Sequence, residues 1–523
     1  MFGIPEGVQT LCNEMKASLK SIKYFIVSSK KELVSLIGVC HSFLEIEIDV
    51  HVVHSFLSNP EIEYLQNSIL PGKVFFHQKV DEKCCKISQT FAGWKIEFMP
   101  LKSSFDIRKL TQIDPEFPKK YIKLLKNSQD VVHGNKTYKS EDFISKTHIK
   151  PIIVVPNIVE EFPKDLINEC NKCEIIFCYN KETIETLKEL CTTPKILYVP
   201  NKNIFDPSML KFRDCLNRFE QRLLFPQENP SNQPLNELKS IDEPITFDKK
   251  RVTYISNHCH IFEDDHILFL GTGSAVPTKH RNVSGCMLNI KEKIIFLDCG
   301  EGTINQLFNS YGSITVLKNL SAIIISHTHA DHFLGMFSII DFVYKAKNKP
   351  ITVIGPKNLV KFIKFFEYDQ KISFIEANGA LDVSFDGIIV KSCAVEHRIY
   401  SNAYAIEIDG RKFSYSGDCR PSKEFAELAN KSDVMIHEAT FKHEMKEDAI
   451  RTQHSTYSEA LDVFKESKSK KLILTHFSQR YKKTVDFPLK NGDVIIAYDM
   501  MVYNFKRMKS DDLKKHIQKN FPE

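Results

Sequence analysis

The chain has 523 residues, 42% of them hydrophobic and 26% charged, a composition typical of a globular protein and not of a disordered or fibrous one. Its net charge of +5 at pH 7 permits an anionic partner without requiring one, so any argument for nucleic-acid binding must rest on local clusters. No apolar run reaches transmembrane length and the first residues lack a signal-peptide pattern, so we expect a protein of the nucleus, the cytoplasm or both that does not bind membranes.

Short β-type runs alternate with helical patterns over residues 1–225, which predicts a layered α/β domain. The strand candidates of this domain are residues 23–28, 74–76, 95–98, 152–155, 174–177 and 196–199. Residues 226–250 are rich in proline, asparagine, glutamine, serine and glutamate, which indicates a linker. A second domain, residues 251–523, follows and carries the apolar run that leads into Gly271.

One segment of the first domain has no counterpart in the second. More than fifty residues separate the strand that ends near Phe98 from the strand that begins at Ile152, whereas the matching connection in the second domain is a tight turn at Asp409-Gly410. Within this segment, residues 102–126 carry seven Lys or Arg against three Asp or Glu, with aromatic residues among them. Basic groups contact phosphates and aromatic rings stack on bases. Taken alone, however, these residues are more simply interpreted as an ordinary solvated insertion.

The apolar run Ile323–Ser326 ends in a cluster of three histidines and one aspartate, which are His327, His329, Asp331 and His332. A buried strand that delivers such residues just before a helical pattern indicates a metal site, because neutral imidazole is the commonest metal ligand in proteins. Histidines two positions apart suit an extended backbone in which both rings reach one ion. Asp331 and His332, which follow on the next turn, could bind a second ion. The alternative is a solvated polar turn with coincidental histidines.

Five further stretches end a β-type run, or precede a helix, with side chains of catalytic type, and they contain His397, Asp418, Glu438, His454 and His476. Loops at strand ends are where sheet proteins assemble their sites. The ligand count suits two ions, one held by His327, His329 and His397, the other by Asp331, His332 and His476, with Asp418 able to bridge them. Imidazole and carboxylate together favour zinc, and two ions about 3.5–4 Å apart stabilise the attacking and leaving oxygens of a displacement.

The two domains resemble a repeat, since Gly300-Glu301-Gly302 is matched by Pro5-Glu6-Gly7 and several apolar strands align. By this alignment His327, His329, Asp331 and His332 face Ser29, Lys31, Leu33 and Val34, Asp418 faces Asn157, and His476 faces Pro200. Lysine, leucine, valine and proline cannot hold zinc, so we expect the first domain to keep the fold without metal chemistry. Because its first matched motif begins at residue 5, we also expect it to lack the opening strands of the second domain. The paired domains are expected to form a monomer that mimics a dimer.

The motif His-x-His-x-Asp-His, with later histidine, aspartate and histidine ligands, resembles the metallo-β-lactamase superfamily. The finer pattern resembles the long form of RNase Z, the tRNA 3′-processing endoribonuclease. The motifs that carry this resemblance are Gly271–Ala275, Pro277–Asn282, His437–Thr440 and His454–Thr456. The resemblance implies an α/β fold of two tandem αββα sandwiches. The first of these is degenerate and carries a protruding tRNA-binding arm at about residues 102–148.

The same resemblance implies roles for individual residues. It implies two zinc ions per chain, held by His327, His329, Asp331, His332, His397, Asp418 and His476, with Asp331 as proton acceptor. Glu438 and His454 resemble the pair that protonates the leaving 3′ oxygen, since a carboxylate bound to an imidazole fixes its tautomer and raises its basicity.

Substrate contacts are implied for the loop 277–282, which resembles the element that reads the tRNA 3′ end, and for the arm, which resembles the one that grips the tRNA elbow. The residues expected to bind substrate are Pro277, Lys279, Arg281, Asn282, Thr440, Lys109, Lys119, Lys120 and Lys123. Of these, Lys279 and Arg281 are expected to point at phosphates or base edges.

We therefore predict a zinc-dependent endoribonuclease that removes the 3′ trailer from precursor tRNA by cleavage after the discriminator nucleotide. The products would be a 3′-hydroxyl on the tRNA and a 5′-phosphate on the trailer. The alternatives are another hydrolase of this fold, acting on RNA, DNA or a thioester, and a catalytically dead RNA-binding scaffold. The arm and the degenerate repeat argue against a compact small-substrate hydrolase. The filled metal and proton-transfer positions argue against the scaffold. The 57 residues between Asp418 and His476 are too few for the cap domain of mRNA 3′-end endonucleases.

Overall fold

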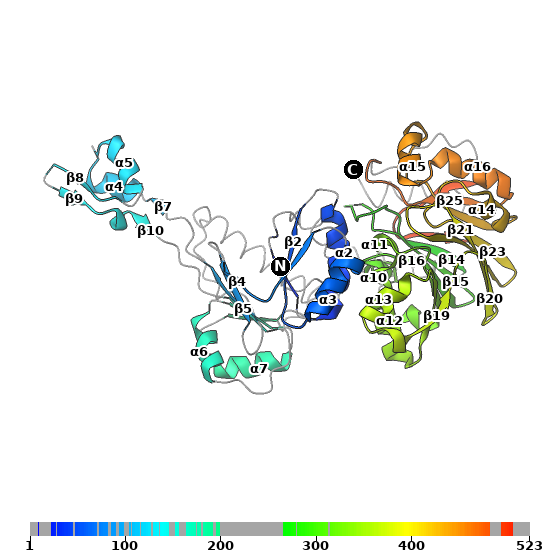
Figure 1. Ribbon diagram of the computed structural model, residues 1–523, viewed down its shortest axis with the longest axis horizontal. Helices are drawn as coiled ribbons and strands as arrows, with labels where there is room; N and C mark the ends of the chain where they lie inside the picture. The colour runs from blue at the N-terminus through cyan, green and yellow to red at the C-terminus, as the bar shows by residue number, and fades with distance from the viewer. Residues whose placement is uncertain are drawn as a thin grey trace.

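The computed structural model describes Gln9, residues 22–198 with short gaps, and residues 265–505 apart from Lys279, 312–313 and 482–492. The linker predicted at residues 226–250 lies outside this described part, so the domain boundaries stay predictions. Figure 1 shows a small arm, a middle α/β body and a larger body that contains the C-terminal half of the chain. None of the helices in the described part combines the length and the apolar character needed to cross a membrane.

The C-terminal half consists of two seven-stranded sheets with helices on their outer faces (Figure 1). The first sheet has the order β19 (Ile372–Glu376), β18 (Ile351–Gly355), β17 (Leu320–Ile324), β16 (Lys293–Cys299), β15 (Gly285–Ile290), β14 (His266–Gly271) and β27 (Met501–Asn504). The second has the order β20 (Leu381–Phe385), β21 (Ile388–Val395), β22 (Ser401–Ile408), β23 (Arg411–Tyr415), β24 (Val434–Glu438), β25 (Leu472–Thr475) and β26 (Val494–Ile496).

Both sheets are covered on two sides, which explains why strands such as β14 and β25 are buried along their whole length. The helices against the first sheet are α10 (Thr303–Tyr311), α11 (Ala330–Phe333), α12 (Met336–Lys347) and α13 (Leu359–Phe365). The helices on the outer side of the second sheet are α14 (Lys423–Leu428), α15 (Lys446–Thr452) and α16 (Tyr457–Ser467). On β17, Ile323 packs in the cluster with the first group of helices and Ile324 packs in the cluster between the sheets. The αββα sandwich predicted for this half is confirmed.

Outside the arm, the described residues of the N-terminal half also form two sheets. The first is parallel and contains β1 (Phe25–Ile26), β2 (Val50–Val53) and β3 (Val74–His77), with helices α2 (Lys30–Leu44) and α3 (Asn59–Tyr64) in its connections. The second has the order β13 (Lys195–Tyr198), β12 (Ile175–Cys178), β11 (Ile152–Val155), β6 (Trp94–Phe98), β5 (Cys85–Gln89) and β4 (Val80–Asp81). Helices α6 (Lys164–Lys172) and α7 (Lys181–Leu190) lie beside this sheet (Figure 1).

The strand pairing supports the repeat predicted from the sequence. The pairs from β4 to β11 are antiparallel and those from β11 to β13 are parallel, which is the succession seen from β20 to β25. β6 therefore corresponds to β22, and β11 to β23, as the alignment proposed. The arm occupies the connection that is a tight turn between β22 and β23.

The arm forms a small folded unit at one end of the molecule (Figure 1). It contains β7 (Ser104–Phe105) paired with β10 (Ile144–Ser145), the helices α4 (Ile107–Ile113) and α5 (Lys119–Lys126), and the hairpin β8 (Val131–His133) and β9 (Lys136–Tyr138). Its core is made of Leu110, Phe117, Leu125, Val131, Tyr138 and Phe143. The arm thus has a hydrophobic core of its own among its described residues.

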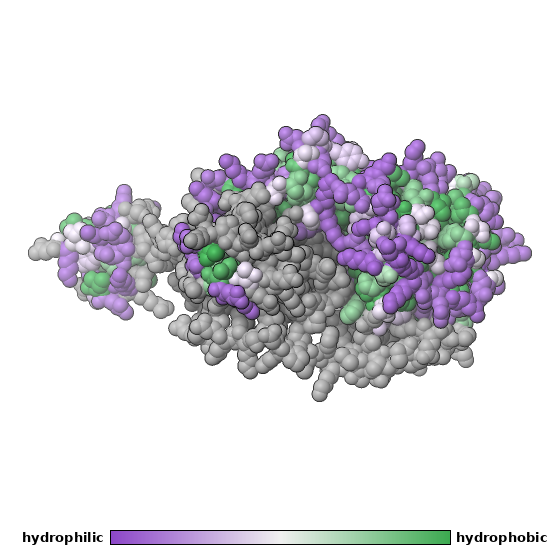
Figure 2. Space-filling model, turned by 90° about the horizontal axis from the view of Figure 1, so that it is seen from below, coloured by the Kyte–Doolittle hydropathy of each residue, from purple (hydrophilic) through white to green (hydrophobic). Residues whose placement is uncertain are grey.

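The two halves share one hydrophobic core, in which Leu33 and Ile37 of α2 belong to the same cluster as Phe337 of α12. At Gly38 the halves approach so closely that a Cβ atom would lie 2.6 Å from the Glu301 carboxylate. On the face shown in Figure 2, the described surface is mostly hydrophilic, with hydrophobic residues in small scattered patches. The apolar side chains of α2, including Leu33 and Ile37, pack in the core between the two halves.

Candidate metal centre

The first group of candidate ligands lies where β17 ends. The backbone stays extended through His329, which is the N-cap residue of α11, and the amide of His332 donates to the carbonyl of His329. Asp331 and His332 therefore lie in the first turn of a short helix, directly after the extended pair His327 and His329. The other ligand candidates follow β21, β23 and β25 of the facing sheet. The site thus forms where strand ends of both sheets meet.

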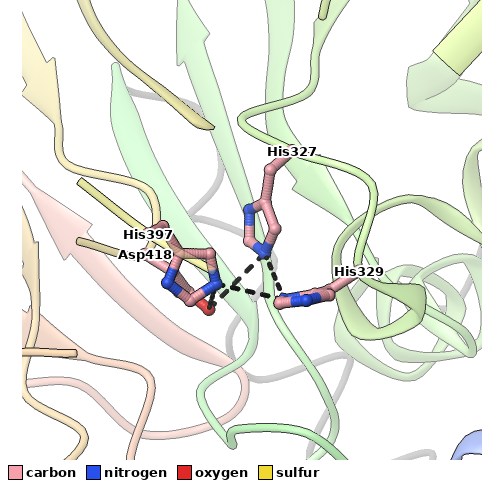
Figure 3. Close-up of side chains that lie close together, drawn as sticks. All are labelled: His327, His329, His397 and Asp418. Atoms are coloured by element: carbon pink, nitrogen blue, oxygen red, sulfur yellow. Dashed lines mark hydrogen bonds and ion pairs between the residues drawn. The ribbon is translucent and has the colours of Figure 1, made fainter. Parts of the chain in front are cut away.

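Four donor atoms form the first cluster, as Figure 3 shows: His327 Nε2, His329 Nδ1, His397 Nε2 and Asp418 Oδ2. His329 Nδ1 lies 2.9 Å from His327 Nε2 and 3.1 Å from His397 Nε2. Asp418 Oδ2 is 3.6 Å from His327 Nε2 and 3.9 Å from His397 Nε2. Three imidazole nitrogens and one carboxylate oxygen that point at a common centre are an arrangement suited to a cation.

A second cluster adjoins the first. Asp331 Oδ2 lies 3.4 Å from both His332 Nε2 and His476 Nε2, and those two nitrogens are 3.3 Å apart. Asp418 lies between the clusters, with Oδ2 3.2 Å from His332 Nε2 and Oδ1 3.3 Å from His476 Nε2. The structure thus brings the seven predicted ligands together in the partition expected from the sequence.

The donor set fits a metal ion on grounds of its own chemistry. Asp418 Oδ1 is buried and has no hydrogen-bond partner in the described part of the chain, so it keeps a free acceptor site. Burial acts to raise the pKa of Asp418, but the imidazoles of His332 and His476 outweigh it and hold that pKa well below the usual value. A metal ion would take the place of the protons on these imidazoles, since ligands must bind it deprotonated.

The outer nitrogens of the ligand imidazoles also have partners, which fixes the ring orientations. His327 Nδ1 is 2.9 Å from the hydroxyl of Ser326, His397 Nδ1 is 2.9 Å from the carbonyl of Gln453, and His476 Nδ1 is 2.8 Å from the hydroxyl of Thr440. The orientation of each of these rings is therefore fixed by a hydrogen bond to a residue outside the ligand set.

Sequence reasoning missed Asp298, the residue that orients His332. Its carboxylate accepts from His332 Nδ1 at 2.7 Å, from the amide and hydroxyl of Ser326 at 2.7 and 2.6 Å, and from the Tyr415 hydroxyl at 2.6 Å. The φ angle of Asp298 is +57°, an uncommon conformation for a residue with a side chain. The available signal was its position at the end of an apolar strand, the same signal that marked the ligands.

Glu438 and His454 form the predicted pair beside the clusters, with His454 Nδ1 2.9 Å from Glu438 Oε1. Burial acts to lower the pKa of His454, but the Glu438 carboxylate outweighs it and raises that pKa to about 9. Glu438 also accepts from the amide of Cys419 at 2.9 Å and from the hydroxyl of Thr440 at 2.6 Å. An imidazole with a raised pKa, held by a fixed carboxylate, suits a proton donor.

Four of the predicted substrate contacts are buried, Pro277, Arg281, Asn282 and Thr440, and the structure corrects the orientation expected for Arg281. Arg281 is 7% exposed, Asn282 5% and Thr440 2%. The guanidinium of Arg281 lies between the rings of Phe477 and Tyr498, at 4.7 and 5.1 Å from their centroids.

Hydrogen bonds hold the same side chains inside the protein. Arg281 donates to the Thr272 hydroxyl at 2.6 Å and to the carbonyl of Ala497 at 3.0 Å. Asn282 donates to the carbonyl of Glu301 at 3.0 Å. Both side chains therefore brace the loop from within, because neighbouring segments accept hydrogen bonds from them.

The other predicted substrate residues fall into two groups. Pro277 is buried in the same loop, and Lys279 lies outside the described residues. In the arm, Lys109, Lys119, Lys120 and Lys123 are exposed, although Lys109 donates to the carbonyl of Asp142 at 2.8 Å. The basic face of α5 is thus open to a partner, and binding by these lysines stays a prediction.

Two sheets packed as a sandwich, flanked by helices and carrying histidine and aspartate clusters at their strand ends, define a metallo-β-lactamase fold. A family described as "Anti-Pycsar protein Apyc1" matches residues 266–494. Ribonuclease Z of Archaeoglobus fulgidus is 32% identical over 296 residues, covering 45% of this chain and 96% of the relative. The chain belongs to the ribonuclease Z family.

Two further comparisons concern a longer relative and a solved structure. Ribonuclease Z 1 of Schizosaccharomyces pombe is 37% identical over 274 residues, covering 45% of this chain and 34% of the relative. The chain thus matches only about a third of that protein's length. The crystal structure of a long form RNase Z from yeast has a TM-score of 0.64 at 18% identity and covers 99% of this chain and 95% of that one. At this identity the likeness concerns the fold, and it extends over both halves.

Arg281→Ala is expected to lower the free energy of unfolding by about 2–4 kcal/mol, because it removes a buried cation that fills the space between two rings and leaves the Thr272 segment unbraced. Denaturant titration of the full chain measures this, with the exposed Lys423→Ala as the matched control. Unchanged stability of Arg281→Ala would contradict the bracing role and would return Arg281 to the set of direct substrate contacts.

Proposed function

We propose that the protein is a zinc-dependent endoribonuclease that removes the 3′ trailer from precursor tRNA by cleavage after the discriminator nucleotide. The tRNA would keep a 3′-hydroxyl and the trailer a 5′-phosphate. The observation that carries this proposal is the pair of ligand clusters joined at Asp418, with the Glu438–His454 pair beside them. The names of the relatives, ribonuclease Z in both cases, support the choice of substrate.

Two zinc ions would be held by the residues of the two clusters. His327, His329 and His397 would hold one ion, and Asp331, His332 and His476 the other, with Asp418 between them. When bound, the ions supply Lewis-acid activation of water and neutralise negative charge on the phosphodiester. Neutral imidazole and carboxylate donors suit zinc better than they suit magnesium or calcium.

Asp331 is the residue we assign to accept a proton from the attacking water. Its Oδ2 atom accepts a hydrogen bond from the amide of Ala275 at 2.7 Å, which fixes the carboxylate in the centre of the site. Nearby imidazoles outweigh its burial and hold the pKa of Asp331 well below the usual value, so it is ionised at neutral pH. An ionised, oriented carboxylate is the form that can take a proton.

His454 is the residue we assign to donate a proton to the leaving 3′ oxygen. Its Nδ1 is held by Glu438, which leaves the other ring nitrogen to reach the substrate. Thr440 is 2.6 Å from Glu438 Oε2 and 2.8 Å from His476 Nδ1, so it ties this pair to the second ligand cluster. We assign Thr440 a positioning role in place of the direct contact that the sequence suggested.

The tRNA is proposed to lie along the N-terminal half and to be gripped by the arm. The exposed lysines of α5 give the arm a basic face that would contact phosphates. Lys279 is proposed to read the tRNA 3′ end from the loop that Arg281 braces. A monomer suffices in this arrangement, since one half cuts while the other holds, and a nuclear or cytoplasmic location fits the substrate.

Incubation of the purified full chain with precursor tRNA and zinc is expected to yield tRNA that ends at the discriminator nucleotide. His329→Ala should lower kcat by roughly 100-fold or more, because it removes one ligand of the first cluster. His51→Gln, which changes a histidine of the N-terminal half, is the matched control and should cut at the wild-type rate. Intact precursor in the presence of zinc, or an undiminished rate for His329→Ala, would refute the proposal.

Replacement of Lys119, Lys120 and Lys123 by alanine is expected to raise KM for precursor tRNA with little change in kcat. The slope of log Kd against log salt should become shallower, by roughly 0.9 for each phosphate that the variant no longer neutralises. The arm core should survive, since all three lysines are exposed. Kinetics over a series of salt concentrations measure both effects, with Lys318→Ala as the control. A lower kcat with unchanged KM would contradict a binding role for the arm.

A further inference from the structure

Asp499 lies in the turn between β26 and β27, which crosses from the second sheet of the C-terminal half to the first. The backbone of this turn is bonded to both sheets. The amide of Ala497 donates to the carbonyl of Leu474 in β25 at 2.8 Å, and the amide of Met500 donates to the carbonyl of Phe269 in β14 at 2.6 Å. The carboxylate of Asp499 is therefore carried by a turn that both sheets hold in place.

The Asp499 carboxylate accepts hydrogen bonds on both of its oxygens. Oδ1 accepts from the amide of Thr272 at 3.0 Å and from its hydroxyl at 2.7 Å. Oδ2 accepts from the amide of Asn282 at 2.5 Å and from Nε2 of Gln306, on α10, at 2.9 Å. One carboxylate therefore holds both ends of the segment 272–282, with one oxygen for each end.

This contact requires the ionised form of Asp499, because a protonated carboxyl would turn one acceptor oxygen into a donor. Burial raises the pKa of Asp499 to about 6. The hydrogen bonds from Asn282 and Thr272 and the positive charge of Arg281 act in the opposite direction and lower that pKa. At pH 8 the carboxylate is thus ionised and can accept on both oxygens.

The segment that Asp499 holds runs beside the metal centre. Within it, the amide of Ala275 donates to Asp331 Oδ2 at 2.7 Å. The segment then continues into the loop 277–282, which is proposed to read the tRNA 3′ end. Asp499 belongs to none of the candidate ligand clusters of the described residues, so it can act on the site only through the segment that it holds.

We infer that Asp499 is a positioning residue for the substrate, because it holds the segment 272–282 at both ends and thereby fixes the loop 277–282 beside the metal centre. The inference rests on the proposed function and deepens it, because it makes substrate binding depend on a residue that lies 217 positions from Asn282 in the sequence. Loss of this carboxylate lets the loop shift and weakens the binding of the tRNA 3′ end.

The test replaces Asp499 by asparagine, which keeps the size and shape of the side chain. An amide has a single acceptor oxygen, so its NH₂ group would face the donors of Thr272 or those of Asn282 and Gln306. For Asp499→Asn we expect KM for precursor tRNA to rise roughly tenfold at pH 8, with kcat within about twofold of the wild type, because the ligand clusters are untouched.

Hydrogen exchange of the full zinc-loaded chain, followed by mass spectrometry, measures the position of the loop without any substrate. Peptides from the segment 272–282 should exchange faster in Asp499→Asn, because the amides of Thr272 and Asn282 lose their acceptor. Peptides from β24 should exchange at the wild-type rate. The matched control is Asp462→Asn, the same change on an exposed carboxylate of α16, and it should keep the wild-type KM and exchange.

A second variant, Thr272→Val, removes one donor to the carboxylate and should raise KM by roughly threefold, so the inference is also tested if Asp499→Asn does not fold. An unchanged KM, a fall in kcat alone, or wild-type exchange of the segment 272–282 would overturn the inference. Failure of the proposed function would appear separately, as intact precursor with the wild type. The exchange measurement would still decide whether Asp499 holds the loop.

Discussion

The Asp418 carboxylate lies buried between two groups of imidazole nitrogens, and the C-terminal half of the molecule is arranged around it. One of its oxygens faces His332 at 3.2 Å and the other faces His476 at 3.3 Å. A buried carboxylate is costly unless positive charge compensates it and its surroundings are held in place. The compensating groups come from both sheets, so the sandwich must close before the site exists. Asp298 and Thr440 then hold the imidazoles in the orientations that serve this centre.

The N-terminal half shows what the same fold does when its ligand positions are replaced. Lys31, which aligns with His329, forms an ion pair with Asp341 of α12 and thus joins the halves. Leu33, which aligns with Asp331, is fully buried in the core that the halves share. The close approach at Gly38 belongs to the same contact. Residues that align with the metal ligands therefore stabilise the contact between the two halves. The connection between β6 and β11 forms the arm.

Much of this arrangement could be predicted from sequence because its signals are local. A ligand at the end of an apolar strand is visible as a pattern in the sequence. Because the strand ends of a sandwich converge, the division of the seven ligands into two clusters could be inferred from these positions. The repeat was visible because strand order survives the replacement of ligands. The short strand Val50–Val53 was overlooked. The inward direction of Arg281 could not be predicted, because it depends on Phe477 and Tyr498 from distant segments. The role of Asp298 likewise depends on contacts with Ser326, His332 and Tyr415, which lie in two other segments.

We propose that the C-terminal half holds two zinc ions. The zinc content of the full chain, measured by mass spectrometry of the metal after dialysis against zinc-free buffer, tests this proposal. We expect two zinc ions per chain in the wild type and fewer than one in Asp418→Ala, because removal of the shared carboxylate weakens both clusters. One zinc ion or none in the wild type, or two in Asp418→Ala, would refute the two-ion centre.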